Sequence, residues 1–133
     1  MKKFIRAIVL VMACVLVFAT LASCGKSIDG IEKKAKDAGF EVEVDKFDEA
    51  DEDGLVAVME IVDPNAKSLV GAFASVAEYA DADNAKKAYD EAKKELDELK
   101  KAAEESGVTI NYTVKKSGKI VIFGTDDVVK KVW

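Results

Sequence analysis

The sequence predicts an α+β domain, with a mainly antiparallel sheet of about five strands and with one long helix and two short helices packed on one face of that sheet. Three observations lead to this prediction. Several short stretches alternate apolar and polar residues, which is typical of half-buried strands. One long stretch carries apolar residues at helical spacing among lysines and glutamates. Strands, a long helix, more strands and a helix then follow one another along the chain.

The first half of the expected domain holds one short helix and three strands. A helix is expected over 28–38, where apolar residues recur at helical spacing. The stretch 40–44 alternates strictly and predicts a half-buried strand, whereas 55–62 is apolar on both faces, as in a central strand. The stretch 65–80 fits either a helix or a strand, and a short turn followed by a strand over 72–80 is favoured.

The second half contains the clearest element, a helix over about 83–106. Two strands over 108–114 and 119–123 are expected to form a hairpin around a turn at 115–118. The stretch 124–127 then supplies the start of a last short helix. The apolar stripe of the long helix is narrow and rich in alanine, so this helix is expected to lie close against the sheet: Ala85, Ala88, Tyr89, Ala92, Leu96, Leu99 and Ala103.

The N-terminal residues have the organisation of an export signal. Lys2, Lys3 and Arg6 form a positive start, and all 13 residues from 7 to 19 are apolar. Such a segment is shorter than the roughly 20 residues that a membrane-spanning helix needs. Two interpretations of this segment alone are an ordinary secretory signal and an uncleaved membrane helix. The residues that follow it indicate a third.

Leu21-Ala22-Ser23-Cys24 resembles, residue for residue, the lipobox of bacterial lipoproteins, which is an aliphatic residue, two small residues and a cysteine. The resemblance implies that the Cys24 thiol receives a diacylglyceryl group. It also implies that a dedicated peptidase recognises Leu21, Ala22 and Ser23, cuts before Cys24 and leaves an amine that is often acylated.

The lipobox resemblance sets the expected organisation of the chain. Residues 1–23 are a signal peptide that is removed, 24–27 are the lipid attachment and a short tether, and 28–133 are a single domain. Two or three acyl chains hold a protein stably on a membrane, whereas one chain does not. The protein is therefore expected on the extracytoplasmic face of the cell membrane, as a monomer anchored through Cys24.

Composition excludes several chemistries. Loss of Lys2, Lys3 and Arg6 from a chain with 20 basic and 25 acidic residues leaves a net charge of about −8, which disfavours nucleic-acid binding. There is no histidine, and no free thiol remains once Cys24 is modified. Histidine or cysteine metal sites and histidine-activated nucleophiles are therefore excluded. We expect no cofactor, no metal site, no catalytic residues and no enzymatic activity.

One acidic stretch, 49–60, has the spacing of the 12-residue EF-hand calcium loop. Carboxylates stand at its first, third and fifth positions, glycine at its sixth and Glu60 at its twelfth. Two departures argue against a calcium site. Glu49 replaces the usual aspartate, and both flanks are expected to be strands rather than helices, so Glu60 would point away from the loop. An acidic hairpin tip is the favoured interpretation.

The segment 79–91 (YADADNAKKAYDE) after a strand, followed by a strand pair and a GTDD turn, resembles small single-domain lipoproteins of Gram-positive bacteria, to which no activity is attached. The expected function is therefore a non-catalytic accessory or binding domain whose protein or small-molecule partner is unknown. A calcium-binding module using 49–60 and a small carboxylate-based hydrolase are the alternatives. The aromatic residues Tyr79, Tyr89, Tyr112 and Trp133 line a ligand groove in one interpretation and fill the core in the other.

Overall fold

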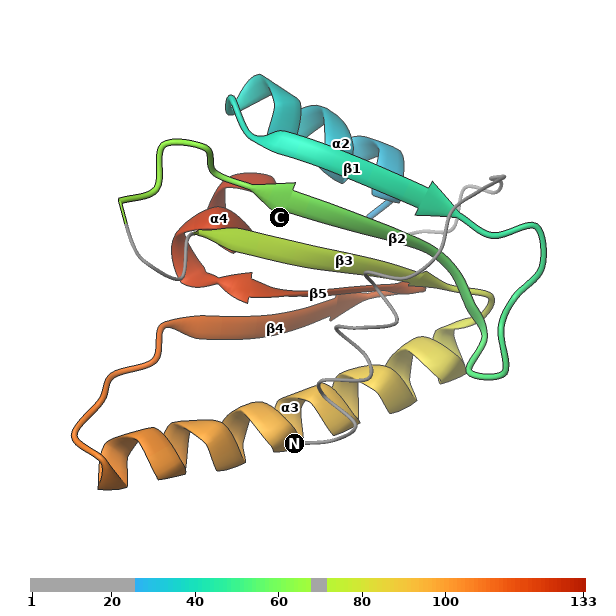
Figure 1. Ribbon diagram of the computed structural model, residues 1–133. Coiled ribbons are helices and arrows are strands. Elements are labelled where there is room, and N and C mark those ends of the chain that lie inside the picture. Colours follow the sequence, from blue (N-terminus) through green and yellow to red (C-terminus); the bar gives the residue numbers. More distant parts are fainter. Residues whose placement is uncertain (1–25, 68–71) are drawn as a thin grey trace.

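The computed structural model describes residues 26–67 and 72–133. The predicted signal, the lipobox with Cys24 and residues 68–71 of the stretch 65–72 lie outside the described residues. Along the chain the elements are α2 (Ile28–Asp37), β1 (Glu41–Lys46), β2 (Leu55–Val62), β3 (Phe73–Tyr79), α3 (Ala82–Glu105), β4 (Tyr112–Ser117), β5 (Ile120–Thr125) and α4 (Asp126–Val132) (Figure 1).

The five strands form one sheet in the order β1-β2-β3-β5-β4, and every neighbouring pair is antiparallel. This confirms the predicted α+β class, the five-stranded antiparallel sheet and the single long helix. The strand at 55–62 lies next to the edge strand β1, and β3 takes the central place. The ambiguous stretch after Pro64 ends in a strand at 73–79, as favoured from the sequence.

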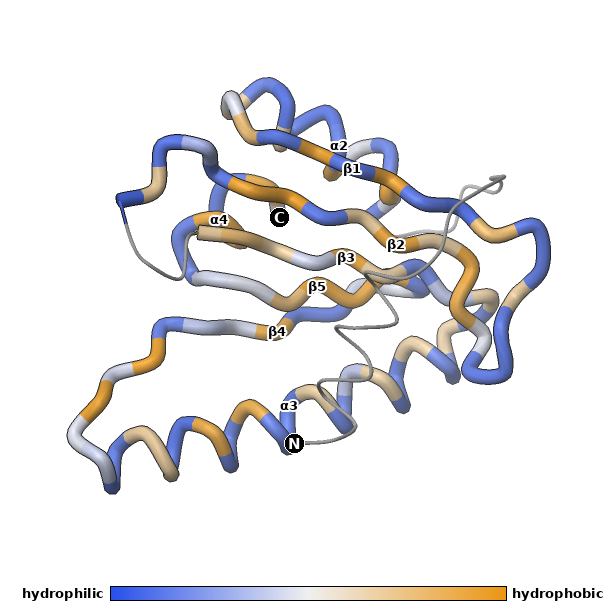
Figure 2. The backbone as a smooth tube through the Cα atoms, in the orientation of Figure 1, coloured by the Kyte–Doolittle hydropathy of each residue, from blue (hydrophilic) through white to orange (hydrophobic). Residues whose placement is uncertain are grey.

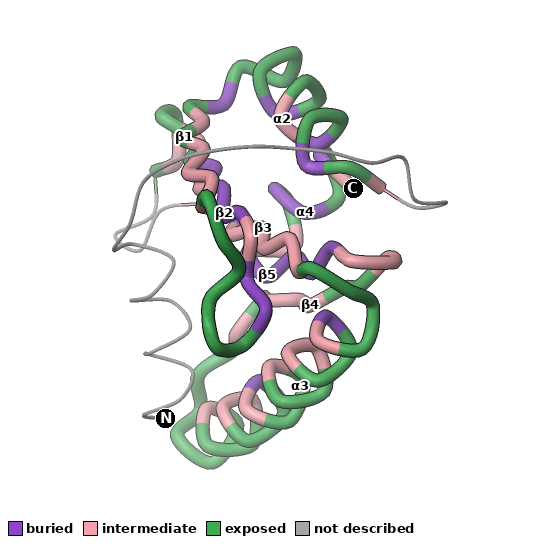
Figure 3. Tube along the Cα trace, turned by 90° about the vertical axis from the view of Figure 1, so that its right-hand side faces the viewer, coloured by how far each residue is buried: buried purple, intermediate pink, exposed green. Residues whose placement is uncertain are grey.

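The helices are divided between the two faces of the sheet, whereas the sequence suggested one shared face. α2 and α4 pack together on one face, and α3 lies on the other, against β3, β5 and β4 (Figure 3). The reason is visible in β5, whose residues from Ile120 to Phe123 are all buried. A strand that is apolar on both faces must be covered on both, so one helix layer cannot suffice.

The main core lies between the sheet and the α2/α4 layer. The inward side chains of β2, β3 and β5 fill it, and Figure 2 shows hydrophobic residues concentrated along these strands. α2 contributes the residues that its helical spacing predicts, and α4 contributes three valines. The core comprises Ile28, Ile31, Ala35, Phe40, Ala57, Met59, Ile61, Ala74, Val76, Ile120, Ile122, Val128, Val129 and Val132.

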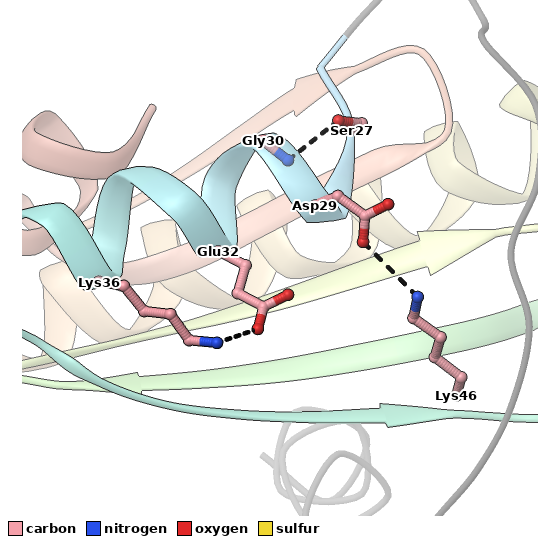
Figure 4. Close-up of polar contacts among 6 residues, drawn as sticks. All are labelled: Ser27, Asp29, Gly30, Glu32, Lys36 and Lys46. Carbon is pink, nitrogen blue, oxygen red and sulfur yellow. Dashed lines mark hydrogen bonds and ion pairs between the residues drawn. The ribbon is translucent and has the colours of Figure 1, made fainter.

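Side-chain caps set where two of the helices begin. The Ser27 hydroxyl accepts a hydrogen bond from the Gly30 N–H at 3.1 Å (Figure 4). The Asp81 carboxylate accepts one from the Asn84 N–H at 2.8 Å. Both residues satisfy donors that a helix leaves free in its first turn. α3 ends before Gly107, which has a φ of +71° that glycine adopts without strain. The predicted long helix over 83–106 is confirmed within one residue at each end.

The last hairpin is shifted along the chain relative to the prediction. β4 begins at Tyr112 rather than at 108, because its partner strand ends at Thr125 and leaves the preceding residues nothing to pair with. Val108 is accordingly 56% exposed. At the other end, Lys115 and Lys116 belong to the strand and the turn consists of Gly118 and Lys119. The predicted turn at 115–118 therefore begins three residues too early and ends one residue too early.

Thr125 starts α4 in a different way from a usual cap. Its hydroxyl makes no capping bond to the helix. It accepts a hydrogen bond from the Phe73 N–H and donates one to the Phe73 carbonyl oxygen, both at 3.2 Å. The predicted last helix is confirmed, and Thr125 joins its start to the first residue of β3.

Candidate functional site

The described chain begins two residues after Cys24, and the first described residue is firmly held. The Lys26 N–H donates to the Ser117 hydroxyl at 3.4 Å, at the end of β4. The Lys26 ammonium group donates to the main-chain oxygen of Trp133 and lies 5.0 Å from the centre of the indole ring. Lys34 of α2 reaches the same oxygen at 3.3 Å. The predicted tether therefore leads directly into a packed corner of the domain. Lys26, Lys34, Ser117 and Trp133 form this corner, hereafter the tether corner.

One ion pair joins α2, the first element after the tether, to the sheet, and a second lies within the helix. Asp29 and Lys46, at the end of β1, approach to 3.5 Å, and Lys36 pairs with Glu32 one helical turn away (Figure 4). Asp29 also stands in the first turn of α2, where a negative charge is favourable. α2 is thus joined to the sheet edge by a charge pair as well as by its buried isoleucines.

The acidic loop between β1 and β2 is organised by its own backbone. One carboxylate oxygen of Asp51 accepts the N–H groups of Asp53 at 2.9 Å and Leu55 at 2.8 Å. Gly54 follows with a φ of +79°. One oxygen of the Asp51 carboxylate therefore closes the turn itself.

Glu60, the twelfth position of the EF-hand spacing, lies in β2 as expected. Its carboxylate accepts a hydrogen bond from the Ser75 hydroxyl of β3 at 3.1 Å. A strand advances about 3.3 Å per residue, so Glu60 lies roughly 20 Å along the chain from Gly54. The structure does not bring the loop carboxylates and Glu60 together. In residues 26–67 and 72–133 there is no group of three carboxylate, histidine or cysteine side chains that could hold a metal ion.

We expect calcium titration of the mature protein, followed by calorimetry, to show no saturable binding below the millimolar range. The reason is that Glu60 lies in β2, bonded to Ser75, and is too distant from the loop carboxylates to complete the oxygen cage. A micromolar Kd that disappears in Asp51→Ala would contradict this interpretation of the loop as a hairpin tip.

A carboxylate pair that the sequence did not indicate lies on the sheet face opposite α2 and α4. Glu43 of β1 and Glu60 of β2 are direct cross-strand neighbours. Partial burial raises the pKa of the Glu60 carboxyl, the Ser75 hydrogen bond lowers it, and the neighbouring Glu43 carboxylate raises it again, with a net upward shift. The alternation of 41–44 already placed Glu41 and Glu43 on one face. The register that sets Glu43 beside Glu60 is not readable from one strand.

The raised pKa of Glu60 has a consequence for stability. The folded chain holds this proton more tightly than the unfolded chain, so its contribution to stability is present below the ordinary pKa of 4.5 and is lost as pH rises through the higher folded pKa. Glu60→Gln should therefore raise the melting temperature at neutral pH and change it little at acidic pH. Melting curves across the pH range measure this, with Glu41→Gln, an exposed site on β1, as the matched control.

The four aromatic residues considered for a groove are distributed over the molecule rather than gathered in one place. Tyr112 packs with Phe73 and Phe123, at ring-centre distances of 5.9 and 5.6 Å. Tyr79 packs with Leu55 and Val58, near the acidic loop. Burial raises the pKa of Tyr79 to about 12. Tyr89 lies on α3, and Trp133 belongs to the tether corner, so these side chains do not line one groove.

Comparison with known proteins adds no relative: no protein-family model, no curated protein and no solved structure matches this chain. Among the described residues, no helix is long and apolar enough to cross a membrane. We therefore infer function from the predicted signal sequence, the tether corner and the carboxylate pair.

Proposed function

We propose that the protein is a bacterial lipoprotein, anchored through acyl chains on Cys24 to the extracytoplasmic face of the cell membrane, and that its domain is a non-catalytic accessory or binding module. The observation that carries this proposal is the lipobox pattern Leu21-Ala22-Ser23-Cys24 after a signal-like apolar segment. No other motif in the chain has comparable specificity.

The position of the domain start supports this function. Ser27 already caps α2, so the chain between Cys24 and the first helical residue, Ile28, spans at most about 13 Å. A domain on so short a tether stays at the membrane surface. Whatever it binds must therefore reach it there, through a partner in the membrane or one just outside it.

The carboxylate hydrolase remains the second candidate, because one observation favours it. Glu43 and Glu60 are neighbouring carboxylates, and the pKa of one of them is raised, as in an acid and base pair. Two features favour a binding role over catalysis. Glu60 is held by Ser75, and Glu43 is an exposed residue of an edge strand, where water is not excluded. A cationic ligand would be attracted to this pair.

Labelling of intact cells tests the proposed location. Spheroplasts treated with a membrane-impermeant, amine-reactive biotin reagent should yield labelled protein, because an extracytoplasmic domain presents the exposed lysines of α3 to the reagent. The labelled protein should stay with the membrane pellet after washing at high salt. Protection from the reagent until the cells are lysed, or release by salt alone, would contradict the proposal.

A further inference from the structure

The tether corner contains the only tryptophan of the chain. Trp133 is half-buried and packs against the main core, so its ring has a fixed position. The ammonium groups of Lys26 and Lys34 both donate to the main-chain oxygen of Trp133, and Lys26 also lies over the ring. One aromatic ring and two positive charges are thus gathered where the tether enters the domain.

This corner is close to the lipid attachment. Only Gly25 lies between Cys24 and Lys26, and the two chain steps from Cys24 to Lys26 span at most about 7 Å. The headgroup region on each side of a bilayer is about as thick as that span. The contacts of Lys26 leave this residue little freedom to swing the domain away from the membrane.

We propose that Trp133, Lys26 and Lys34 form a membrane-contact surface that binds the headgroups of an anionic phospholipid bilayer and fixes the orientation of the domain. This inference rests on the proposed acylation of Cys24. An indole has an apolar body with one polar N–H, which suits the interface between headgroups and hydrocarbon. The two ammonium groups pair with lipid phosphates, and this local attraction offsets the repulsion expected from a net charge of about −8.

The contact has an orienting effect. α2 and α4, which carry the corner, lie on one face of the sheet, and α3 lies on the other (Figure 3). Contact through Trp133 therefore turns the α2/α4 side toward the bilayer and α3 away from it. The face that carries Glu43 and Glu60 is then left accessible to a partner.

The single tryptophan provides the test. Mature protein purified from membranes is reconstituted into vesicles that contain phosphatidylglycerol and phosphatidylcholine, with or without bromine on the acyl chains near the headgroup. Brominated lipid should quench most of the Trp133 fluorescence. The control variant carries Trp133→Phe and Tyr89→Trp, which moves the indole to α3, and its fluorescence should be little quenched. Lys26→Gln with Lys34→Gln should reduce the quenching of Trp133 in anionic vesicles.

Flotation of the vesicles separates this inference from the proposed anchoring. Protein that floats with the vesicles is anchored, and an unquenched Trp133 in floating protein overturns the membrane contact alone. Equal quenching of Trp133 and of the α3 tryptophan also overturns it, because the domain would then have no fixed orientation. Protein that does not float overturns both the anchoring and the contact.

Discussion

A Cys24→Ala chain should keep its first 23 residues and carry no lipid. The acyl group is attached to the Cys24 sulfur in the lipoproteins that the N-terminus resembles, and the peptidase cuts only after that step. Alanine offers no nucleophile for the transfer, so the effect should be all or none. The measurement is labelling with a radioactive fatty acid, together with the mobility of the protein on a gel.

Cys14→Ala is the matched control for this experiment. Cys14 lies in the middle of the apolar segment, and alanine there leaves the segment equally apolar. This variant should be labelled and processed like the natural chain. If Cys24→Ala takes up as much label as Cys14→Ala, the lipid is attached elsewhere, and the lipoprotein interpretation is wrong.

Gly124→Ala should be among the most destabilising single substitutions in the domain. A Cβ atom at Gly124 would lie 2.3 Å from the Phe73 carbonyl oxygen and 2.6 Å from the Ala74 Cα. Both atoms belong to the backbone of β3, and Thr125 bonds both the N–H and the carbonyl oxygen of Phe73. Relieving the clash would therefore require a shift of the β3 backbone and loss of these hydrogen bonds. Overpacking of this kind costs typically about 1–3 kcal/mol. The cost is a large share of the roughly 5–15 kcal/mol that stabilises a folded domain.

Urea denaturation of the purified variant, followed by circular dichroism, measures this loss. Gly107→Ala is the control, because a Cβ there meets no atom within 4 Å and only the positive φ opposes it. Its cost should be about 1 kcal/mol, from the left-handed backbone alone. Equal denaturation midpoints for the two variants would mean that β3 and β5 do not approach as closely as described.

Local pattern was enough to predict the class of fold. Each of three stretches has a pattern typical of one element. Residues 40–44 alternate, residues 55–62 are apolar on both faces, and residues near 83–106 have apolar side chains at helical spacing. Each became the expected strand or helix. These features depend on residues close in sequence, which is why one sequence shows them.

Features that depend on pairing between distant segments were not predicted. The start of β4 at Tyr112 is set by where β5 ends, and the placement of α3 follows from a strand that needs cover on both faces. The same holds for the candidate site. Lys26 meets Trp133 across 107 positions of sequence, and Glu60 meets Ser75 through strand register. The stretch 49–60 shows that local spacing can also mislead. Its carboxylates have the spacing of a calcium loop, but Glu60 lies in β2 and bonds to Ser75, away from the loop.

The most direct test of the central claim is the mass of the N-terminal peptide of the mature protein. Trypsin cleaves after Lys26, so protein purified from membranes should yield the tripeptide Cys24-Gly25-Lys26. The account predicts that this tripeptide carries a diacylglyceryl group on the Cys24 sulfur, with or without an acyl chain on its amine. A longer peptide that begins before Cys24 and carries a free Cys24 thiol would contradict it.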